Sequence, residues 1–367
     1  MGNENNSHTK NSRRAFLKRT GLSATLVGFV GSASATEYVE IVTHVQGDQP
    51  KFTKEVPKSW VDHHEAAKQA KETLRNKYFN TEGFSRVSVG PFDHYFGGKR
   101  GFAVYVGITS SDLADQLPSN VNGVPVVTEE YEEPTNLSAC YNDINKDDVP
   151  GGIIFDGTGT SGSQFYIDTD GDGSYEQYLM TAAHVTGDEC YDQTGTDVTQ
   201  KDDTWGTIIQ QSSSTDTVVC DPYYGYSVTN EIREQDGSTK FVVGSVSESG
   251  LADIISSSTE TVRKTGIALG TNYAGVIRKD VSDGFSSCVD YNHEGVRVEN
   301  NGAPGDSGGP IYDVQDGDAY IVSFTSKGED PTDSYDCDGA QIYDKVVGPS
   351  AHNLKDTYNG VFTAPVG

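Results

Sequence analysis

The chain has 367 residues, of which 54 are acidic and 27 are basic, and its formal net charge at pH 7 is −27. Five basic residues and one acidic residue lie in residues 1–35, which leaves 22 basic and 53 acidic residues and a net charge of −31. So few cations exclude nucleic acid as a partner, because binding phosphates requires clustered Lys and Arg. Dense carboxylates keep a protein hydrated where salt screens their repulsion, so the composition predicts a halophilic, haloarchaeal-type source.

The amino terminus has the features of an export signal. The pair Arg13-Arg14 precedes a mildly apolar stretch over residues 21–31 and the small-residue sequence Ala33-Ser34-Ala35. This pattern is typical of a twin-arginine (Tat) signal peptide over residues 1–35, cleaved after Ala35. The apolar stretch is shorter than the about 20 residues that span a bilayer. We therefore expect a secreted, extracellular product with no membrane anchor in its mature form, delivered by the Tat export machinery.

Residues 36–132 have the patterning of a small α+β domain. The apolar spacing predicts strands and helices in the order β-α-β-β-α-β, which is the order of a ferredoxin-like sandwich. The expected strands are 37–42, 85–89, 102–108 and 124–127, and the expected helices are 60–78 and 111–117. Residues 133–148 are acid-rich, contain Pro134 and lack periodicity, so we predict that they form a linker.

An acidic sequence with two glycines follows at residues 168–176. Asp168, Asp170 and Asp172 have the spacing of calcium ligands in a binding loop, but the twelfth position is Leu179 instead of a bidentate acid. The same residues suit the turn of a β-hairpin. Calcium binding and a plain hairpin turn therefore both fit this sequence, and no cofactor is expected to be required.

A single histidine follows an apolar strand at residues 179–182. A histidine held at a strand end is a suitable general base, and it needs a carboxylate to fix its tautomer and stabilise its charged form. For His184, Asp216 is the best-placed acid, because it follows a serine-rich turn and opens the next expected strand. Asp221 is the alternative, whereas Asp202 and Asp203 precede the strand before that turn.

A glycine-lined serine occurs in the sequence Gly305-Asp306-Ser307-Gly308-Gly309-Pro310. A serine hydroxyl is a poor nucleophile at neutral pH, so it needs a base within hydrogen-bond reach and amide donors for the developing oxyanion. Glycines on both sides let the backbone approach that closely. We therefore predict that Ser307 is a nucleophile.

The order His184, Asp216, Ser307 and the strings Thr-Ala-Ala-His and Gly-Asp-Ser-Gly-Gly-Pro resemble those of trypsin-like (chymotrypsin-fold) serine peptidases. The resemblance covers residues 149–367 and implies an all-β peptidase domain of two packed six-stranded antiparallel barrels. It also implies that Ser307 attacks the scissile carbonyl, that His184 acts as base and then acid, and that the amides of Gly305 and Ser307 form the oxyanion hole. The expected function is therefore a serine endopeptidase that cleaves polypeptides through an acyl-enzyme.

The same resemblance suggests the residues that contact the substrate. Asn301 would lie at the base of the pocket, and Ser326 and Gly328 would supply main-chain hydrogen bonds. Gln341 would narrow or polarise the pocket. Since position 301 is not an aspartate, we expect a small or polar side chain before the cleaved bond and no preference for Arg or Lys.

Residues 117–127 resemble the end of an amino-terminal domain that precedes the peptidase in some prokaryotic members of the family. Such a domain is either a removable pro-segment or a permanent appendage, and the sequence leaves both open. In animal members a freed amino terminus pairs with the aspartate before the nucleophile, here Asp306. Val149 could supply that terminus, although Pro150 departs from the usual pattern.

Five cysteines follow the signal region, so one must stay free or pair elsewhere. Val185 follows the histidine where animal members usually have a cysteine, so the animal disulfide pattern cannot be transferred. We predict that Cys190 pairs with Cys220 and that Cys288 pairs with Cys337.

Two other functional classes remain beside the peptidase. One is a non-catalytic binding protein that retains the fold, and the presence of all three triad residue types argues against it. The other is an esterase-like acyl hydrolase, in which the serine would precede the histidine in the chain. Here the histidine comes first.

Overall fold

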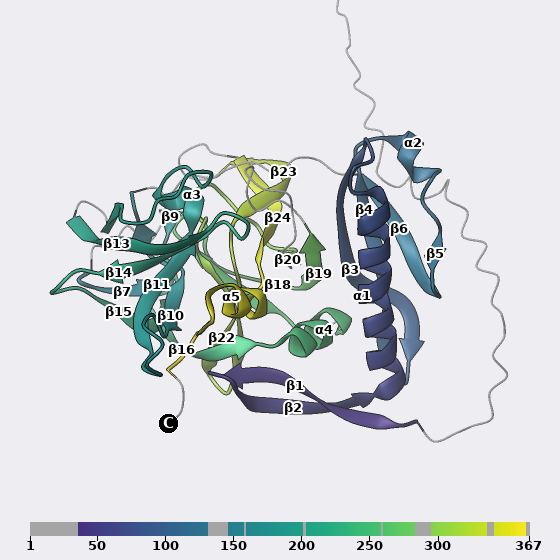
Figure 1. Ribbon diagram of the computed structural model, residues 1–367, viewed down its shortest axis with the longest axis horizontal. Helices are drawn as coiled ribbons and strands as arrows, with labels where there is room; N and C mark the ends of the chain where they lie inside the picture. Colours follow the sequence, from purple (N-terminus) through teal and green to yellow (C-terminus); the bar gives the residue numbers. More distant parts are fainter. Residues whose placement is uncertain are drawn as a thin grey trace, which may run out of the picture. The chain divides into compact units, whose positions relative to one another are not determined.

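The computed structural model describes residues 36–130, 146–157, 159–200, 203–257, 260–282, 295–335 and 341–364 (Figure 1). The described residues from Glu37 onward belong to one compact unit. We call residues 37–130 the amino-terminal segment and residues 146–364 the carboxy-terminal part. Among the described residues, no helix is long and apolar enough to cross a membrane. The predicted signal peptide and most of the predicted linker lie outside the described residues.

The amino-terminal segment is built around one long helix that packs on two strands. Its elements are β1 (Tyr38–Gln46), β2 (Gln49–Pro57), α1 (Lys58–Tyr78), β3 (Phe84–Phe96), β4 (Lys99–Ile108), α2 (Ser111–Ala114), β5 (Asn120–Val121) and β6 (Val124–Glu130). Buried Trp60, Ala67, Ala70 and Leu74 recur at helical spacing along α1 and face β3 and β4. The predicted helix 60–78 and the four predicted strands are therefore present. Strand β2 is additional, and its mostly exposed, polar residues have no apolar alternation to mark it.

The segment differs from the ferredoxin-like sandwich that its element order predicts. A ferredoxin-like fold would place its four strands in one sheet, but β1 lies in a different sheet from β3, β4 and β6. The hairpin partner of β1 is β2, and its other edge pairs with the distant strand β16 (Thr239–Val246). The ferredoxin-like prediction is therefore wrong, because β1 finds its partners outside the set that sequence order suggests.

The carboxy-terminal part consists mainly of β-strands, as the all-β prediction expects. Its remaining strands are β7 (Asp148–Gly151), β8 (Ile154–Phe155), β9 (Gly159–Thr160), β10 (Ser163–Ile167), β11 (Glu176–Ala182), β12 (Asp197–Gln200), β13 (Asp203–Ser212), β14 (Thr217–Pro222), β15 (Ser227–Arg233), β17 (Val262–Gly266), β18 (Gly270–Ala274), β19 (Val276–Ser282), β20 (Gly295–Val298), β21 (Pro310–Gln315), β22 (Asp318–Phe324), β23 (Lys327–Tyr335), β24 (Gln341–Pro349) and β25 (Gly360–Val361). Its helices are α3 (Ala183–Thr186), α4 (Glu248–Ser256) and α5 (Ala351–Tyr358).

Three large sheets hold the molecule together. A six-stranded sheet has the order β12-β13-β14-β11-β10-β25, and a nine-stranded sheet contains the path β18-β17-β21-β22-β16-β1-β2. An eight-stranded sheet has the order β23-β24-β20-β19-β3-β4-β6-β5. Among the described residues these pairings do not close into the two six-stranded barrels that the resemblance implied. Instead, β1 and β3 of the amino-terminal segment pair with β16 and β19, so the second and third sheets continue into that segment.

Candidate active site

His184 is held where β11 gives way to the short helix α3. Leu179 and Ala183 are buried in a common cluster, and β11 pairs with β14 through Ala182 and Thr217. The apolar residues therefore fix the strand end, while the histidine side chain, 12% exposed, lies at the edge of this core.

Asp216 lies in the turn between β13 and β14 with a φ of 49°, in the left-handed region, and it is fully buried. Its Oδ2 lies 2.7 Å from Nδ1 of His184, and its Oδ1 accepts a hydrogen bond of 3.0 Å from the His184 amide. Ala183 also donates its amide to the Asp216 carbonyl at 3.0 Å. The structure therefore brings His184 and Asp216 together. Asp221 lies further along β14 and Asp203 begins β13, while Asp202 lies outside the described residues.

The charge of Asp216 changes the basicity of His184. Burial disfavours the imidazolium, but the negative charge and hydrogen bond of Asp216 outweigh this cost and raise the pKa of His184 above its ordinary value. Glu189 adds to the rise, whereas Lys327 opposes it. The shift makes His184 a stronger base than an isolated imidazole.

Ser307 lies in the turn that precedes β21 and is 2% exposed. Its hydroxyl donates to the Ser326 carbonyl at 3.4 Å, and the Ser326 hydroxyl donates to Oδ2 of Asp216 at 2.6 Å. Ser326 therefore contacts both the serine and the acid that holds His184. Nε2 of His184 is buried and forms no hydrogen bond with the Ser307 hydroxyl or with any other group among the described residues.

Gly308 allows the serine turn to approach β11. At this position φ is 84°, and a Cβ would lie 2.1 Å from Oγ1 of Thr181 and 2.3 Å from the Thr160 carbonyl. No side chain fits there. The glycine that follows Ser307 is therefore required for the six-stranded sheet, which carries His184, to contact the turn that carries the serine.

Gly305 and Ser307 carry the two amides that are predicted to form the oxyanion hole. Gly305 has a φ of 95°, and its carbonyl accepts from Oγ1 of Thr160 at 2.5 Å. Within the described ranges, the amides of Gly305 and Ser307 donate to no other residue. Two free donors beside a serine hydroxyl are what stabilisation of an oxyanion needs.

Asp306 forms an ion pair that the sequence interpretation missed. Lys264 on β17 contacts Oδ2 of Asp306, and both side chains are fully buried. Asp306 also accepts hydrogen bonds from the amides of Ala268, Leu269 and Ala303, at 3.0, 3.2 and 3.1 Å. Val149, the residue considered as its partner, is buried in β7 and pairs with β15 instead. The positive charge that pairs with Asp306 in this structure therefore comes from an internal lysine.

Two of the four predicted substrate residues, Asn301 and Gly328, lie near Tyr343. Asn301 is exposed and adjoins Gly302, which forms a β-bridge with Tyr343. A Cβ on Gly328 would lie 2.7 Å from the Tyr343 ring. Ser326 precedes β23; its amide donates to the Val347 carbonyl at 2.9 Å, and its carbonyl accepts from the Ser307 hydroxyl.

Gln341 lies apart from that group. It begins β24, and its Nε2 donates to the Thr332 carbonyl at 2.9 Å. The side chain therefore joins two neighbouring strands. The substrate roles of these four residues stay predictions, and Tyr343 is the aromatic neighbour that sequence reasoning did not identify.

The acidic sequence forms the turn of the β10–β11 hairpin, so the hairpin interpretation is correct. Carboxylate oxygens of Asp168, Asp170 and Asp172 lie within 4.8 Å of one another. Asp168 already accepts from the amides of Gly171 and Gly173, at 2.7 and 3.0 Å. The geometry is that of a self-bonded turn, and calcium binding stays a prediction.

One predicted disulfide is wrong. Cys220, on β14, is a free thiol in the core, and burial raises its pKa. Cys190 lies in an exposed turn after α3 and is disulfide-bonded to another residue. The side chain of Cys220 points into the core, so it cannot reach the turn. Cys140, Cys288 and Cys337 lie outside the described residues.

No protein-family model and no curated protein matches the sequence. Similar solved structures include the Nocardiopsis protease NAPase (17% identity, TM-score 0.42), Thermobifida fusca protease A (17%, 0.41) and Cellulomonas bogoriensis chymotrypsin (18%, 0.40). Each match covers 59% of this chain and 100% of the other. The similar structures are thus proteases, but identities this low and TM-scores below 0.5 do not carry an activity over to this chain.

Proposed function

We propose that this chain is a secreted serine endopeptidase of the chymotrypsin-fold class, adapted to high salt and exported through the Tat pathway. The observation that carries the proposal is the double contact of Ser326, which joins Ser307 to the Asp216–His184 pair. A serine, a histidine with a raised pKa and a buried aspartate in this arrangement suit acyl transfer.

In the proposed reaction, Oγ of Ser307 attacks the scissile carbonyl carbon while its proton passes to Nε2 of His184. The amides of Gly305 and Ser307 bind the oxyanion. The carbon–nitrogen bond then breaks, and the departing amine takes the proton from His184. Water attacks the acyl ester in the same way, and release of the carboxylic acid regenerates Ser307. Asp216 stabilises the imidazolium in both steps.

Labelling with a fluorophosphonate tests this proposal. The signal-processed chain, purified in concentrated salt, should be labelled at Ser307 and should cleave peptides. Ser307→Ala and His184→Ala should each lower kcat by about a million-fold, because the three residues act as a unit. His352→Gln is the control, since this histidine lies in α5, where its ring contacts Ser350.

The same samples in dilute buffer test the salt adaptation, because repulsion among the surplus acids should then abolish activity. Full activity in dilute buffer and loss in salt would contradict it. Failure of the wild-type protein to label or to cleave any peptide would favour the non-catalytic binding protein.

A further inference from the structure

The amino-terminal segment shares its sheets with the carboxy-terminal part. β1 pairs with β16 through His44 and Val246, and β3 pairs with β19 through Val89 and Lys279. Figure 1 shows β1 and β2 beneath α4, and β3 and β4 beside β19. Removing the segment would therefore leave two strand edges, at β16 and β19, without partners.

The two parts also share one hydrophobic core. A single buried cluster contains Trp60, Leu74 and Val104 from the segment together with Leu251 and Val346 from the carboxy-terminal part. Each of these residues is at most 2% exposed. Without the segment, the apolar residues of β20, β24 and α4 would face water, which is unfavourable in proportion to the exposed area.

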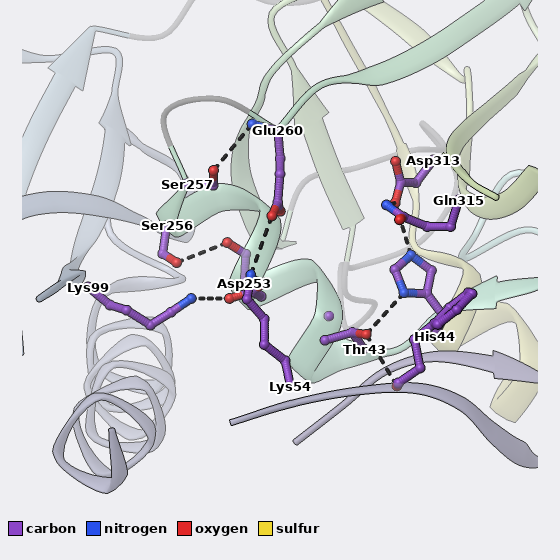
Figure 2. A network of polar contacts seen from close by, with 12 residues as sticks. Thr43, His44, Lys54, Lys99, Asp253, Ser256, Ser257, Glu260, Asp313 and Gln315 are labelled. Atoms are coloured by element: carbon purple, nitrogen blue, oxygen red, sulfur yellow. Dashed lines mark hydrogen bonds and ion pairs between the residues drawn. The ribbon is translucent and has the colours of Figure 1, made fainter. Parts of the chain in front are cut away.

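Charged residues cross the same boundary in several places. Lys54 and Lys99 both contact the Asp253 carboxylate on α4, as Figure 2 shows. In the same view, Nε2 of His44 lies 2.9 Å from Oδ2 of Asp313 on β21. Asp253 and Asp313 would lose these partners if the segment left, and an unpaired carboxylate in a buried setting is strongly destabilising.

A ring of four charged residues is the part of this boundary that reaches the candidate active site. Arg86 and Glu129 come from the segment, whereas Arg297 and Glu329 come from β20 and β23. Arg86 contacts Glu329, and Nε of Arg297 lies 2.7 Å from Oε2 of Glu329. Glu129 closes the ring, at 3.1 Å from Arg297 and 3.2 Å from Arg86. The side chains of Arg86 and Glu329 are each only 2% exposed.

Glu329 is three residues beyond Ser326 on the same stretch of chain. Ser326 contacts both Ser307 and Asp216, and Gly328, the predicted substrate contact, adjoins Glu329. A buried ion pair that fixes Glu329 therefore fixes the start of β23 beside the serine. Because small displacements of positioning groups cost large factors in rate, this contact bears on catalysis.

We propose that residues 37–130 remain part of the working enzyme, and that Arg86 is a positioning residue that holds β23 against the active site. This inference rests on the proposed function only where its tests measure kcat/KM. It decides between the removable pro-segment and the permanent appendage in favour of the appendage.

Cleavage of the linker tests the retention of the segment. A recognition sequence for a site-specific protease is inserted between residues 131 and 145 of the full chain, and the purified protein is cut in concentrated salt. We expect the two pieces to co-elute on gel filtration, with kcat/KM per fluorophosphonate-titrated Ser307 unchanged within about twofold. The kcat/KM of the carboxy-terminal piece alone should be lower by about 100-fold or more. If the pieces separate, or if activity rises when the segment is lost, the inference is wrong.

Two matched variants test the role of Arg86. Arg86→Met removes the contact with Glu329, whereas Lys99→Met removes a cation that crosses the same boundary but contacts α4. We expect Arg86→Met to lower kcat/KM for an extended peptide about 10- to 100-fold while sparing a small ester that does not extend along β23. Lys99→Met should change kcat/KM by the same factor for the peptide and the ester. Arg86→Lys should restore part of the kcat/KM for the peptide.

These outcomes separate the two proposals. Equal losses on ester and peptide in Arg86→Met, or no loss, would overturn the positioning role. If the wild-type chain neither labels nor hydrolyses any substrate, the proposed function fails, and co-elution of the cut pieces still decides whether the segment is retained.

Discussion

Two buried aspartates near Ser307 are neutralised in different ways. Asp216 contacts a histidine, which titrates, and accepts from the Ser326 hydroxyl. Asp306 pairs with Lys264, which is fully buried, and accepts three backbone amides. The pair of Asp216 and His184 can gain or lose a proton during a reaction, whereas the pair of Asp306 and Lys264 fixes a turn. In the proposed mechanism, an aspartate therefore takes part in the chemistry at position 216, whereas the aspartate at position 306 maintains the shape of the site.

Between these two aspartates, the larger effect on kcat should come from Asp216→Asn. An asparagine cannot stabilise the imidazolium or enforce its tautomer, so we expect kcat to fall by about 10,000-fold. Asp216 raises the pKa of His184, and the neutral histidine is the proposed base, so the acid limb of the kcat/KM profile should lie at lower pH in the variant than in the wild-type protein. Profiles of kcat/KM against pH measure both effects.

The same pair has a signature in stability. Because the folded pKa of His184 is raised, its stabilising contribution is fully present below the unfolded pKa and is lost as pH rises through the folded pKa. Asp216→Asn should remove this dependence from the free energy of unfolding. Asp221→Asn is the control for the alternative acid. If it reproduced the loss of kcat while Asp216→Asn did not, the assignment of the acid would be wrong.

The second effect should come from Lys264→Met, which leaves Asp306 buried without its cation. Removing one partner of a buried ion pair typically destabilises by about 3–5 kcal/mol. Denaturant unfolding in salt should show that loss, and Lys264→Met with Asp306→Asn together should recover part of it. Lys58→Met, which breaks an exposed pair with Asp62, should leave the unfolding midpoint almost unchanged. Unaltered stability in Lys264→Met would show that the three amides suffice for Asp306.

The predictable half of the site consists of local patterns. The apolar strand that ends at His184 and the glycines around Ser307 are both visible within a few residues, because each sets the backbone at that point. Asp216 was identifiable because it opens the strand after a serine-rich turn. These assignments needed no knowledge of which strands pair.

The other half depends on long-range pairing. Lys264 reaches Asp306 because β17 pairs with β21, opposite Ile311, and nothing in its own neighbourhood distinguishes it from other lysines. The ferredoxin-like prediction failed for the same reason, since β1 pairs with a strand about 200 residues later in the chain. The pairing of Cys190 with Cys220 also failed, because spacing along the chain does not tell which face of β14 a side chain occupies.

The smallest effect should come from Ser326→Ala. Its hydroxyl is one of three donors to the Asp216 carboxylate, so the acid keeps both contacts with His184 when it is lost. A hydrogen bond to a charged group contributes about 1.5–3 kcal/mol, and we expect kcat/KM to fall about tenfold with a small shift in the acid limb. Ser323→Ala is the matched control, because Ser323 is equally buried but donates to the Pro349 carbonyl at 2.8 Å. Both variants should lose similar stability, and only Ser326→Ala should alter the pH profile. A shift of equal size in Ser323→Ala would mean that the Ser326 hydroxyl acts through packing and not through the charge of Asp216.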